Sequence, residues 1–381
     1  MKLGPKDAET AARLLFLGVG SKTVVTPRRS LCLTLGENTE SKKVRSEKIR
    51  GINELPRRIT RQTLEEIDSD RDKQEEFYSD LGRRFGALDT SGELTMFIFT
   101  YTNGDAKERR PNSTPSETEI EYLCGLLNHY LNDIWVPPIV PDLKGASYIP
   151  YLKSFYKRAE SNGRVPFAGL IPFVSSLEVR QLEGLFMEYG INYFVMDFAG
   201  KNPFAMHGSI NQVSQMVRMI ERETGSPCFL HAINVPFTRS LWKNEVIPAR
   251  DILLFEMGFN CFGSSHIPRL IPRELAESMK TSTRHYRLFN RRDYGYYRDD
   301  RINPLDFQES ETTQVSLSDF IPGMVWKETA EIEKLFNVER QGMEADTIRT
   351  KLIEGESLRR HLLAKARVTP ALMRKIAEVA S

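Results

Sequence analysis

The sequence predicts an α/β protein whose parallel strands close into a TIM-type (β/α)8 barrel. Segments typical of strands and of helices alternate through the middle of the chain about 30–35 residues apart, and the alternation recurs about five or six times. The strand-like segments are continuous apolar runs, as expected for parallel strands that are buried on both faces. With 381 residues, 40% of them hydrophobic, the chain can bury a large core. A doubly wound open sheet is the alternative fold.

The first readable element is the β-rich run TMFIFTYTNG, which ends in turn residues. A helix is expected next, because Ser116 can cap it and Glu119, three residues later, completes a capping box. Gly190 and Gly225 end two of the later helices. We expect strands in residues 95–104, 133–141, 165–174, 191–200, 227–236 and 260–266, and helices in residues 115–131, 149–160, 175–190, 211–225 and 246–259.

Both ends of the chain differ from this middle part. Residues 1–61 carry 14 Lys and Arg against 6 Asp and Glu, and we expect a loop over residues 36–60. Residues 62–80 carry 2 basic and 8 acidic residues, which predicts a charged helix inserted early in the barrel. The barrel domain should therefore occupy residues 1–310, with a helical appendage and its linker in residues 311–381. Thr369 and Pro370 begin a last helix there, which would pack on the barrel or bind a protein partner.

Composition excludes several classes of site. The net charge of +2 indicates no class of partner, and the four cysteines stand too far apart for a zinc or disulfide pattern. The six histidines show no metal-ligand spacing either, so we expect no metal and no cofactor. We expect no membrane-spanning helix, because no run approaches about 18 apolar residues. A reduced, cytoplasmic setting fits this composition.

The strand ends carry the candidate chemistry, because functional groups of a parallel barrel lie there and in the following loops. Asp197 is the best candidate for a catalytic group, since a carboxylate at the tip of a buried strand is costly unless paired or used. A structural ion pair is the alternative for Asp197. His231 is either a second catalytic group or a hydrogen-bonded core histidine. The candidates for substrate binding are Asn103, Asn234, Ser264 and Ser265.

The order of several segments resembles the tRNA-guanine transglycosylase superfamily. ARDILLFEMGFNCFGSS, residues 249–265, is similar to the family's seventh strand, "A-x-A-x-G-x-D-x-F-D-[CS]", with Gly258, Phe262 and Ser264 matched. CFLHAINVP resembles the "HL-x-G-x-G-x-P" strand, GSKTVVTPRRS the "G-x-[VI]-x-TP" opening, and LDTSGELTMF the "DSGGFQ" loop. The resemblance covers roughly residues 10–300, and it is the order of the motifs that carries it.

The resemblance implies exchange of guanine or 7-deazaguanine in tRNA or DNA, through attack of an aspartate on the ribose anomeric carbon. Gly263 stands at the position of that aspartate, so the acid must come from another residue. Asp197 is the first candidate, and Asp89 in the loop match is the second. The family's Cys-x-Cys-x-x-Cys zinc cluster is absent. A non-catalytic nucleic-acid-binding subunit, or an unrelated TIM-barrel hydrolase or lyase, are the alternatives.

Residues 284–301 interleave arginines with aromatic residues and predict a surface for nucleic acid. Arginines neutralise phosphates, and aromatic faces stack on unpaired bases. A packed surface loop whose arginines pair with neighbouring aspartates is the alternative. The candidate contacts are Arg284, Arg287, Arg291, Arg292 and Tyr294.

Overall fold

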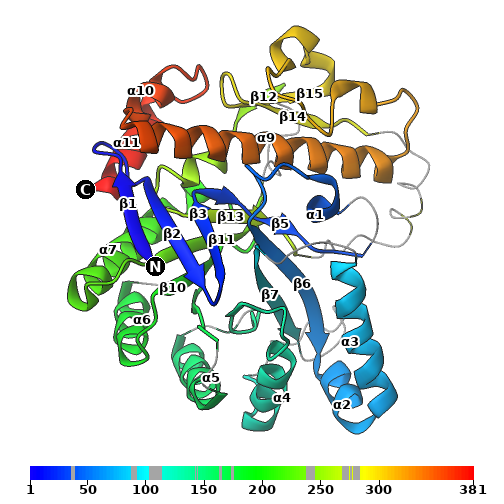
Figure 1. Ribbon diagram of the computed structural model, residues 1–381, viewed down its shortest axis with the longest axis vertical. Helices are drawn as coiled ribbons and strands as arrows, with labels where there is room; N and C mark the ends of the chain where they lie inside the picture. Colours follow the sequence, from blue (N-terminus) through cyan, green and yellow to red (C-terminus); the bar gives the residue numbers. More distant parts are fainter. Residues whose placement is uncertain are drawn as a thin grey trace.

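Parallel strands form the centre of the molecule in the computed structural model (Figure 1). The structure describes all residues except 36–38, 87–91, 103–113, 142, 144, 163–164, 173–175, 237–244, 268–273, 275–276 and 278–283. One sheet has the order β4 (Arg28–Arg29), β13 (Cys261–Ser264), β11 (Phe229–Val235), β10 (Tyr193–Asp197) and β9 (Gly169–Ile171). The other has the order β5 (Leu31–Cys32), β6 (Ile52–Thr60), β7 (Leu94–Thr102) and β8 (Ile134–Trp135). Every neighbouring pair in both sheets is parallel, so the predicted α/β class with parallel strands is confirmed.

The two sheets meet at both edges. Ser30 alone separates β4 from β5 along the chain. At the other edge, a parallel bridge joins Trp135 of β8 to Phe167, two residues before β9 begins.

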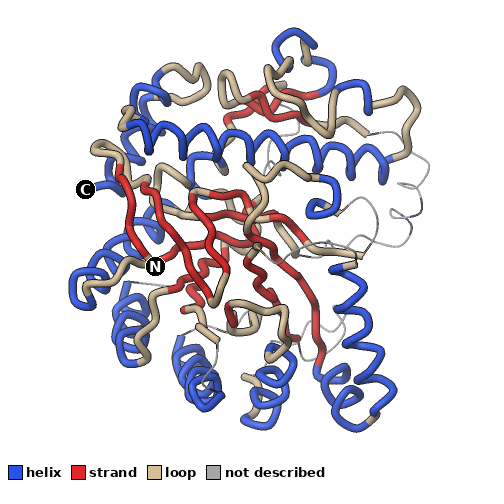
Figure 2. The backbone as a smooth tube through the Cα atoms, viewed as in Figure 1, coloured by secondary structure: helices blue, strands red, loops and turns tan. Residues whose placement is uncertain are grey.

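Helices connect the strands and cover them on the outside (Figure 2). α4 (Glu117–Leu127), α5 (Tyr148–Asn162), α6 (Ser176–Glu188) and α7 (His207–Thr224) alternate with β7 to β11 as predicted. The capping box of Ser116 and Glu119 is present, which confirms the predicted start of α4. The acidic stretch forms two helices, α2 (Arg61–Ser69) and α3 (Arg71–Phe85), rather than one.

The prediction of a loop over residues 36–60 is wrong. This stretch contains the short helix α1 (Glu40–Lys43) and the nine-residue strand β6. The sequence of β6 does not look like a strand, because it contains two arginines and Pro56, and proline cannot donate a backbone hydrogen bond to a sheet. Proline fits here because β5 pairs only with Asn53 and Glu54, so the ladder on that side has ended before Pro56.

The predicted helix over residues 246–259 is also wrong. Val246–Pro248 form strand β12, and only a 3-10 turn, Ile252–Leu254, follows. β12 pairs antiparallel with β15 (Gly295–Arg298), which pairs with β14 (Arg287–Asn290). The apolar residues after β12 are buried in the core without forming a helix, and the pairing of β12 with a distant strand is not visible in the local sequence.

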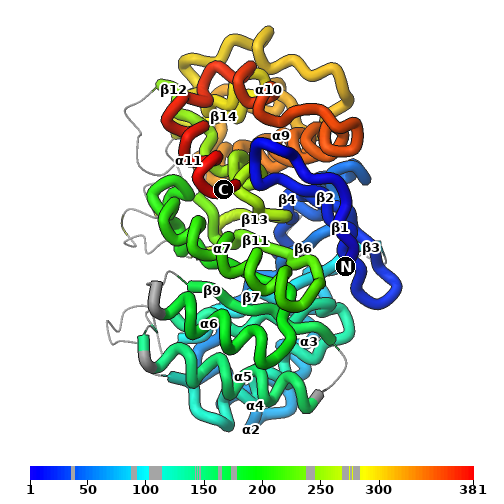
Figure 3. Tube along the Cα trace, turned by 90° about the vertical axis from the view of Figure 1, so that its left-hand side faces the viewer, coloured from blue at the N-terminus to red at the C-terminus, as the bar shows by residue number. Residues whose placement is uncertain are grey.

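The two ends of the chain pack against the strands. An antiparallel sheet of β1 (Lys2–Lys6), β2 (Arg13–Val19) and β3 (Lys22–Thr26) precedes β4. The long helix α9 (Trp326–Glu354) runs across the molecule, followed by α10 (Leu358–Leu363) and α11 (Pro370–Ala380) (Figure 1). α11 begins with the predicted Thr369 cap and lies beside α7 (Figure 3), where Arg218 donates to the Val379 carbonyl.

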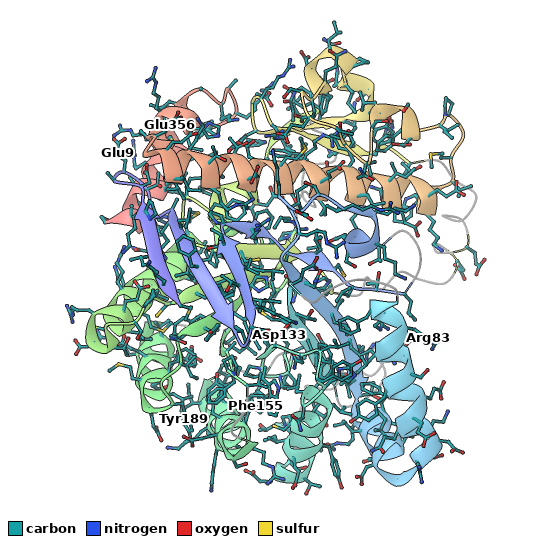
Figure 4. The ribbon with its side chains drawn as sticks, in the orientation of Figure 1. Glu9, Arg83, Asp133, Phe155, Tyr189 and Glu356 are labelled. Carbon is teal, nitrogen blue, oxygen red and sulfur yellow. The ribbon has the colours of Figure 1, made fainter. Side chains whose placement is uncertain are left out.

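The chain ends also touch each other. Figure 4 labels Glu9 and Glu356 side by side, where the turn after β1 meets the start of α10. Ser357 Oγ donates to the Glu9 carboxylate at 2.9 Å, and the Leu358 amide donates to Asp7 at 3.0 Å. Across the described part of the chain, the helices are all too short or too polar to cross a membrane.

Candidate active site

A buried carboxylate, that of Glu54, lies where β5 and β13 end. Glu54 belongs to β6 and pairs with Cys32, the last residue of β5. His231 Nε2, from β11, lies 2.7 Å from Glu54 Oε1, and His266 Nε2, just after β13, contacts Oε2. Ser30 Oγ donates a further hydrogen bond to Oε1. The side chain of Glu54 is 1% exposed, so these partners replace water around it.

The two imidazoles keep this carboxylate charged. Burial alone would raise the pKa of Glu54, but hydrogen bonds from His231 and His266 hold that pKa well below its usual range. Burial alone would lower the pKa of each histidine, but a neighbouring thiol and Glu54 raise both values to about 10. The thiols are Cys261 beside His231 and Cys32 beside His266.

Gly263 in β13 faces the Glu54 carboxylate at very short range. An ideal Cβ on Gly263 would lie 1.8 Å from Glu54 Oε1 and 2.4 Å from its Cδ, far inside contact distance. Any side chain at position 263 would therefore occupy the space that the Glu54 carboxylate fills. The space beside Gly263 is thus filled by a carboxylate that comes from another strand, β6.

A second carboxylate, Asp197, is linked to the first through hydrogen bonds. Asn234 Nδ2 donates to Asp197 Oδ1 at 2.8 Å, and Asn234 Oδ1 accepts from the His266 amide at 2.9 Å. The side chain of His266 then contacts Glu54. Asn234 has φ of 56°, a left-handed conformation that is costly for a non-glycine residue and recurs at functional sites. Burial raises the pKa of Asp197, although the Asn234 hydrogen bond opposes this.

A polar network flanks the site on the side of α1 and α9. Ser264 Oγ accepts from Arg29 Nη2 and donates to Glu40 Oε1 at 3.1 Å. Lys334 Nζ of α9 lies 2.9 Å from the same oxygen of Glu40. Burial alone would raise the pKa of Glu40, but Lys334 and Arg29 lower it below its usual range.

The structure brings most of the predicted site residues together. Asp197, Asn234, His231 and Ser264 all belong to the connected networks around Glu54. Asn234, predicted to bind substrate, makes hydrogen bonds to protein groups through both the nitrogen and the oxygen of its amide. Ser265 Oγ is buried without a hydrogen-bond partner among the described residues. Asp89 and Asn103 lie outside the described residues.

The predicted nucleic-acid arm, in contrast, is mostly turned into the protein. Tyr294 is buried and donates to Glu344 at 2.8 Å, so it offers no face for a base. Arg291 contacts Glu344 and Glu309, and Arg284 forms an ion pair with Glu333. Arg287 is buried as well. Only Arg292 among the five candidates is exposed, so the alternative of a packed segment fits this arm better.

Sequence reasoning missed Glu54, and it gave no role to His266 at the end of NCFGSSH. The rule that a carboxylate in a buried strand is paired or used would select Glu54, but Pro56 and two arginines make its strand resemble a loop in the sequence. His266 follows directly after the predicted Ser264 and Ser265. Among the described residues, no group of three or more His, Cys, Asp or Glu is arranged to hold a metal ion.

Comparison with known proteins adds little. No family model matches the chain, and no curated protein matches it. Among solved structures, the chain is similar to a carboxyl transferase domain of Rhizobium etli pyruvate carboxylase determined with pyruvate. The match covers 99% of this chain and 67% of that chain, with 11% identity and a TM-score of 0.38. A likeness that weak supports no argument about function.

Proposed function

We propose that this chain is a glycosyl-transfer enzyme that exchanges guanine or 7-deazaguanine in DNA or tRNA, with Glu54 as its nucleophile. In this proposal the two parallel sheets form one closed TIM-type barrel. The adjacency of β4 and β5 around Ser30, and the bridge between Trp135 and Phe167, support closure at both edges. Asp197 and Ser264 then lie at the C-terminal ends of β10 and β13, where barrel enzymes carry their sites, and the Glu54 side chain reaches the end of β13 from the third residue of β6.

The position of Glu54 carries the proposal. The resemblance places the nucleophilic acid at the residue that is Gly263 in this chain. The Glu54 carboxylate fills the space into which a side chain at 263 would project. A carboxylate can thus reach the same point from β6, and the glycine is required to make room for it.

The second support is a pair of carboxylates in opposite environments. The pKa of Glu54 is lowered by its two histidines, whereas the pKa of Asp197 is raised by burial. Such a separation is the usual sign of an acid and a base assigned to different tasks. Glycosyl transfer with a covalent intermediate needs one ionised carboxylate as nucleophile and one protonated carboxyl as acid.

The proposed reaction has two steps. Glu54 attacks the anomeric carbon, the bond from that carbon to the base nitrogen breaks, and Asp197 gives its proton to the departing base. In the second step, the incoming base attacks the glycosyl ester and loses its proton to Asp197. The ester bond breaks and returns the Glu54 carboxylate. His231 and His266 hold Glu54 in place and in its ionised form.

Incorporation of labelled guanine tests the proposal. Wild-type protein should transfer the label into tRNA or duplex DNA, and Glu54→Gln should abolish the transfer while oligonucleotide binding persists. Asp197→Asn should slow the exchange, because the departing base then lacks its acid. Full activity of Glu54→Gln would rule out Glu54 as the nucleophile.

A binding subunit without catalysis is the second candidate function. Both oxygens of Glu54 already have partners and the side chain is almost fully covered, so His266 must move before a sugar can reach it. Wild-type protein that binds nucleic acid but exchanges no base with tRNA or DNA would favour this second candidate.

A further inference from the structure

Three cations gather on the surface beside the candidate site. Lys42 and Lys43 belong to α1 and Arg45 follows it; Lys43 and Arg45 are exposed and Lys42 is half-buried. None of the three side chains has a hydrogen bond or ion pair with any residue that the structure describes. Most other basic residues of the positively charged N-terminal stretch are already paired, such as Arg13 with Glu221 and Arg50 with Glu93.

The segment that carries these cations, residues 40–50, is fixed to the site at its first residue. Glu40 is fully buried and accepts from the Cys32 amide at 2.8 Å, at the end of β5. Its other oxygen binds Ser264 and Lys334. Lys42, the first of the three cations, therefore lies only two residues from Glu40, whose side chain contacts Ser264 of the candidate active site.

The same segment is fixed at its other end. Arg28 donates to the Glu47 carbonyl at 3.1 Å, and Arg349 of α9 donates to the Lys48 carbonyl at 2.5 Å. Val44 and Ile49 are buried in a small apolar cluster with Leu31, Val338 and Met343. The backbone is thus held in place while the charged side chains between these contacts point outward.

We propose that residues 40–50 form the surface that holds the phosphate backbone of the polynucleotide next to the candidate site. The inference rests on the proposed function in taking the partner to be a polynucleotide. Clustered like charges repel, so they cost stability unless an anionic partner neutralises them. A segment fixed at both ends loses little conformational freedom on binding, which favours affinity. Glu47 is the one exposed acid of the segment.

Salt dependence of binding measures this contact directly. Each phosphate neutralised adds about 0.9 to the slope of log affinity against log salt on duplex DNA, and about 0.7 on single strands. The double variant Lys43→Ala/Arg45→Ala should therefore bind a labelled duplex oligonucleotide more weakly, with a slope smaller by about 1.8. Anisotropy titrations between about 50 and 200 mM salt give both quantities.

Lys2 and Lys6 provide a matched control. Both are exposed on β1, which lies at the left in Figure 1, whereas α1 lies to the right of the centre. Lys2→Ala/Lys6→Ala removes the same charge and should leave the slope unchanged. The thermal midpoint of Lys43→Ala/Arg45→Ala should not fall, because these side chains have no partner among the described residues to lose.

The outcomes separate this inference from the proposed function. A slope that is reduced in Lys43→Ala/Arg45→Ala but not in Lys2→Ala/Lys6→Ala supports the proposed phosphate-binding surface, even if no base exchange is ever observed. Equal effects of the two double variants, or no effect of either, would overturn it. Binding to anionic vesicles through Lys43 and Arg45, with no binding to oligonucleotides, would assign the surface to a membrane and overturn it as well.

Discussion

Glu54 and Gly263 constrain each other at atomic distance. A methyl group at 263 would overlap the Glu54 carboxylate, which is itself held by two histidines and cannot move without breaking those contacts. Gly263→Ala should therefore lower the free energy of unfolding by about 1–3 kcal/mol, the usual cost of overpacking. Urea denaturation of the purified variants measures it.

A double-mutant cycle isolates the cause. In a Glu54→Ala background the space is empty, so Gly263→Ala should cost much less than it does in the wild type. Additive losses would mean that Gly263 is required for some reason other than Glu54.

The histidine–glutamate cluster should give stability a definite pH dependence. The pKa of each imidazole is raised to about 10, so its contribution is complete below about pH 6.5 and is lost as pH rises toward 10. The pKa of Glu54 is lowered, so its contribution is complete above about pH 4.3 and is lost at lower pH. Glu54→Gln should lower the thermal midpoint most between about pH 4.3 and 6.5.

Calorimetry at several pH values tests this expectation. The difference between wild type and Glu54→Gln should shrink as pH approaches 10. Glu75→Gln, which removes an exposed partner of Arg71, is the control and should have little effect at any pH. A constant difference from pH 5 to 10 would show that the cluster is not ionised as described.

Candidate residues could be predicted where the strand before them could be read. Apolar runs mark β10, β11 and β13 in the sequence, so the polar residues within and at the ends of these strands could be predicted as candidates: Asp197, His231, Asn234 and Ser264. Glu54 could not be found in this way, since it lies early in a strand interrupted by Pro56 and arginines. The hydrogen bonds between these residues connect different strands, so the spacing of residues along the sequence does not predict them.

At the scale of elements, the β14–β15 hairpin is a packed part of the protein. Arg291 lies between Glu344 and Glu309, and the side chain of Glu344 is 2% exposed. Arg291→Glu would remove the guanidinium that bridges these two carboxylates and place a third carboxylate beside them, which His361 and Lys365 at Glu344 and Arg340 at Glu309 neutralise only in part. It should lower the free energy of unfolding by about 3 kcal/mol or more, as for other broken buried pairs.

Arg292 is the control for this prediction, because it is exposed and its guanidinium reaches only backbone carbonyls at 3.3 Å or more. Arg292→Glu should stay within about 0.5 kcal/mol of the wild type. Equal stability of the two variants would indicate that Arg291 is free in solution and would return the arm to consideration as a nucleic-acid surface.

Elements with strong local signals were predictable and the others were not. The helix α4 carries its own capping box, and α11 begins with Thr369 and Pro370. The strand β12 exists only because β15 pairs with it, from about 50 residues further along the chain. Elements of the second kind depend on contacts between residues far apart in sequence, which local patterns do not record.

At the scale of the whole molecule, α9 ties the strands to the β14–β15 hairpin. Asn337 accepts from the Phe289 amide at 2.8 Å and donates to the Arg287 carbonyl at 2.8 Å. Gln341 accepts from Arg29 of β4, and Arg349 donates to the Pro27 carbonyl. These contacts satisfy buried backbone and side-chain groups, so the helix is a structural part of the strand core.

Truncation should therefore affect the whole chain. A protein of residues 1–325 lacks α9 together with α10 and α11, and the loss of α9 leaves buried polar groups of β4 and β14 without partners, each costing about 1–3 kcal/mol. We expect it to show no cooperative thermal transition by circular dichroism and to bind a hydrophobic dye. A protein of residues 1–366 loses only α11, which packs on α7, and should keep a cooperative transition at a lower midpoint. If residues 1–325 unfold cooperatively at the wild-type midpoint, α9 is an independent appendage, and Lys334 cannot be needed to hold Glu40 at the candidate site.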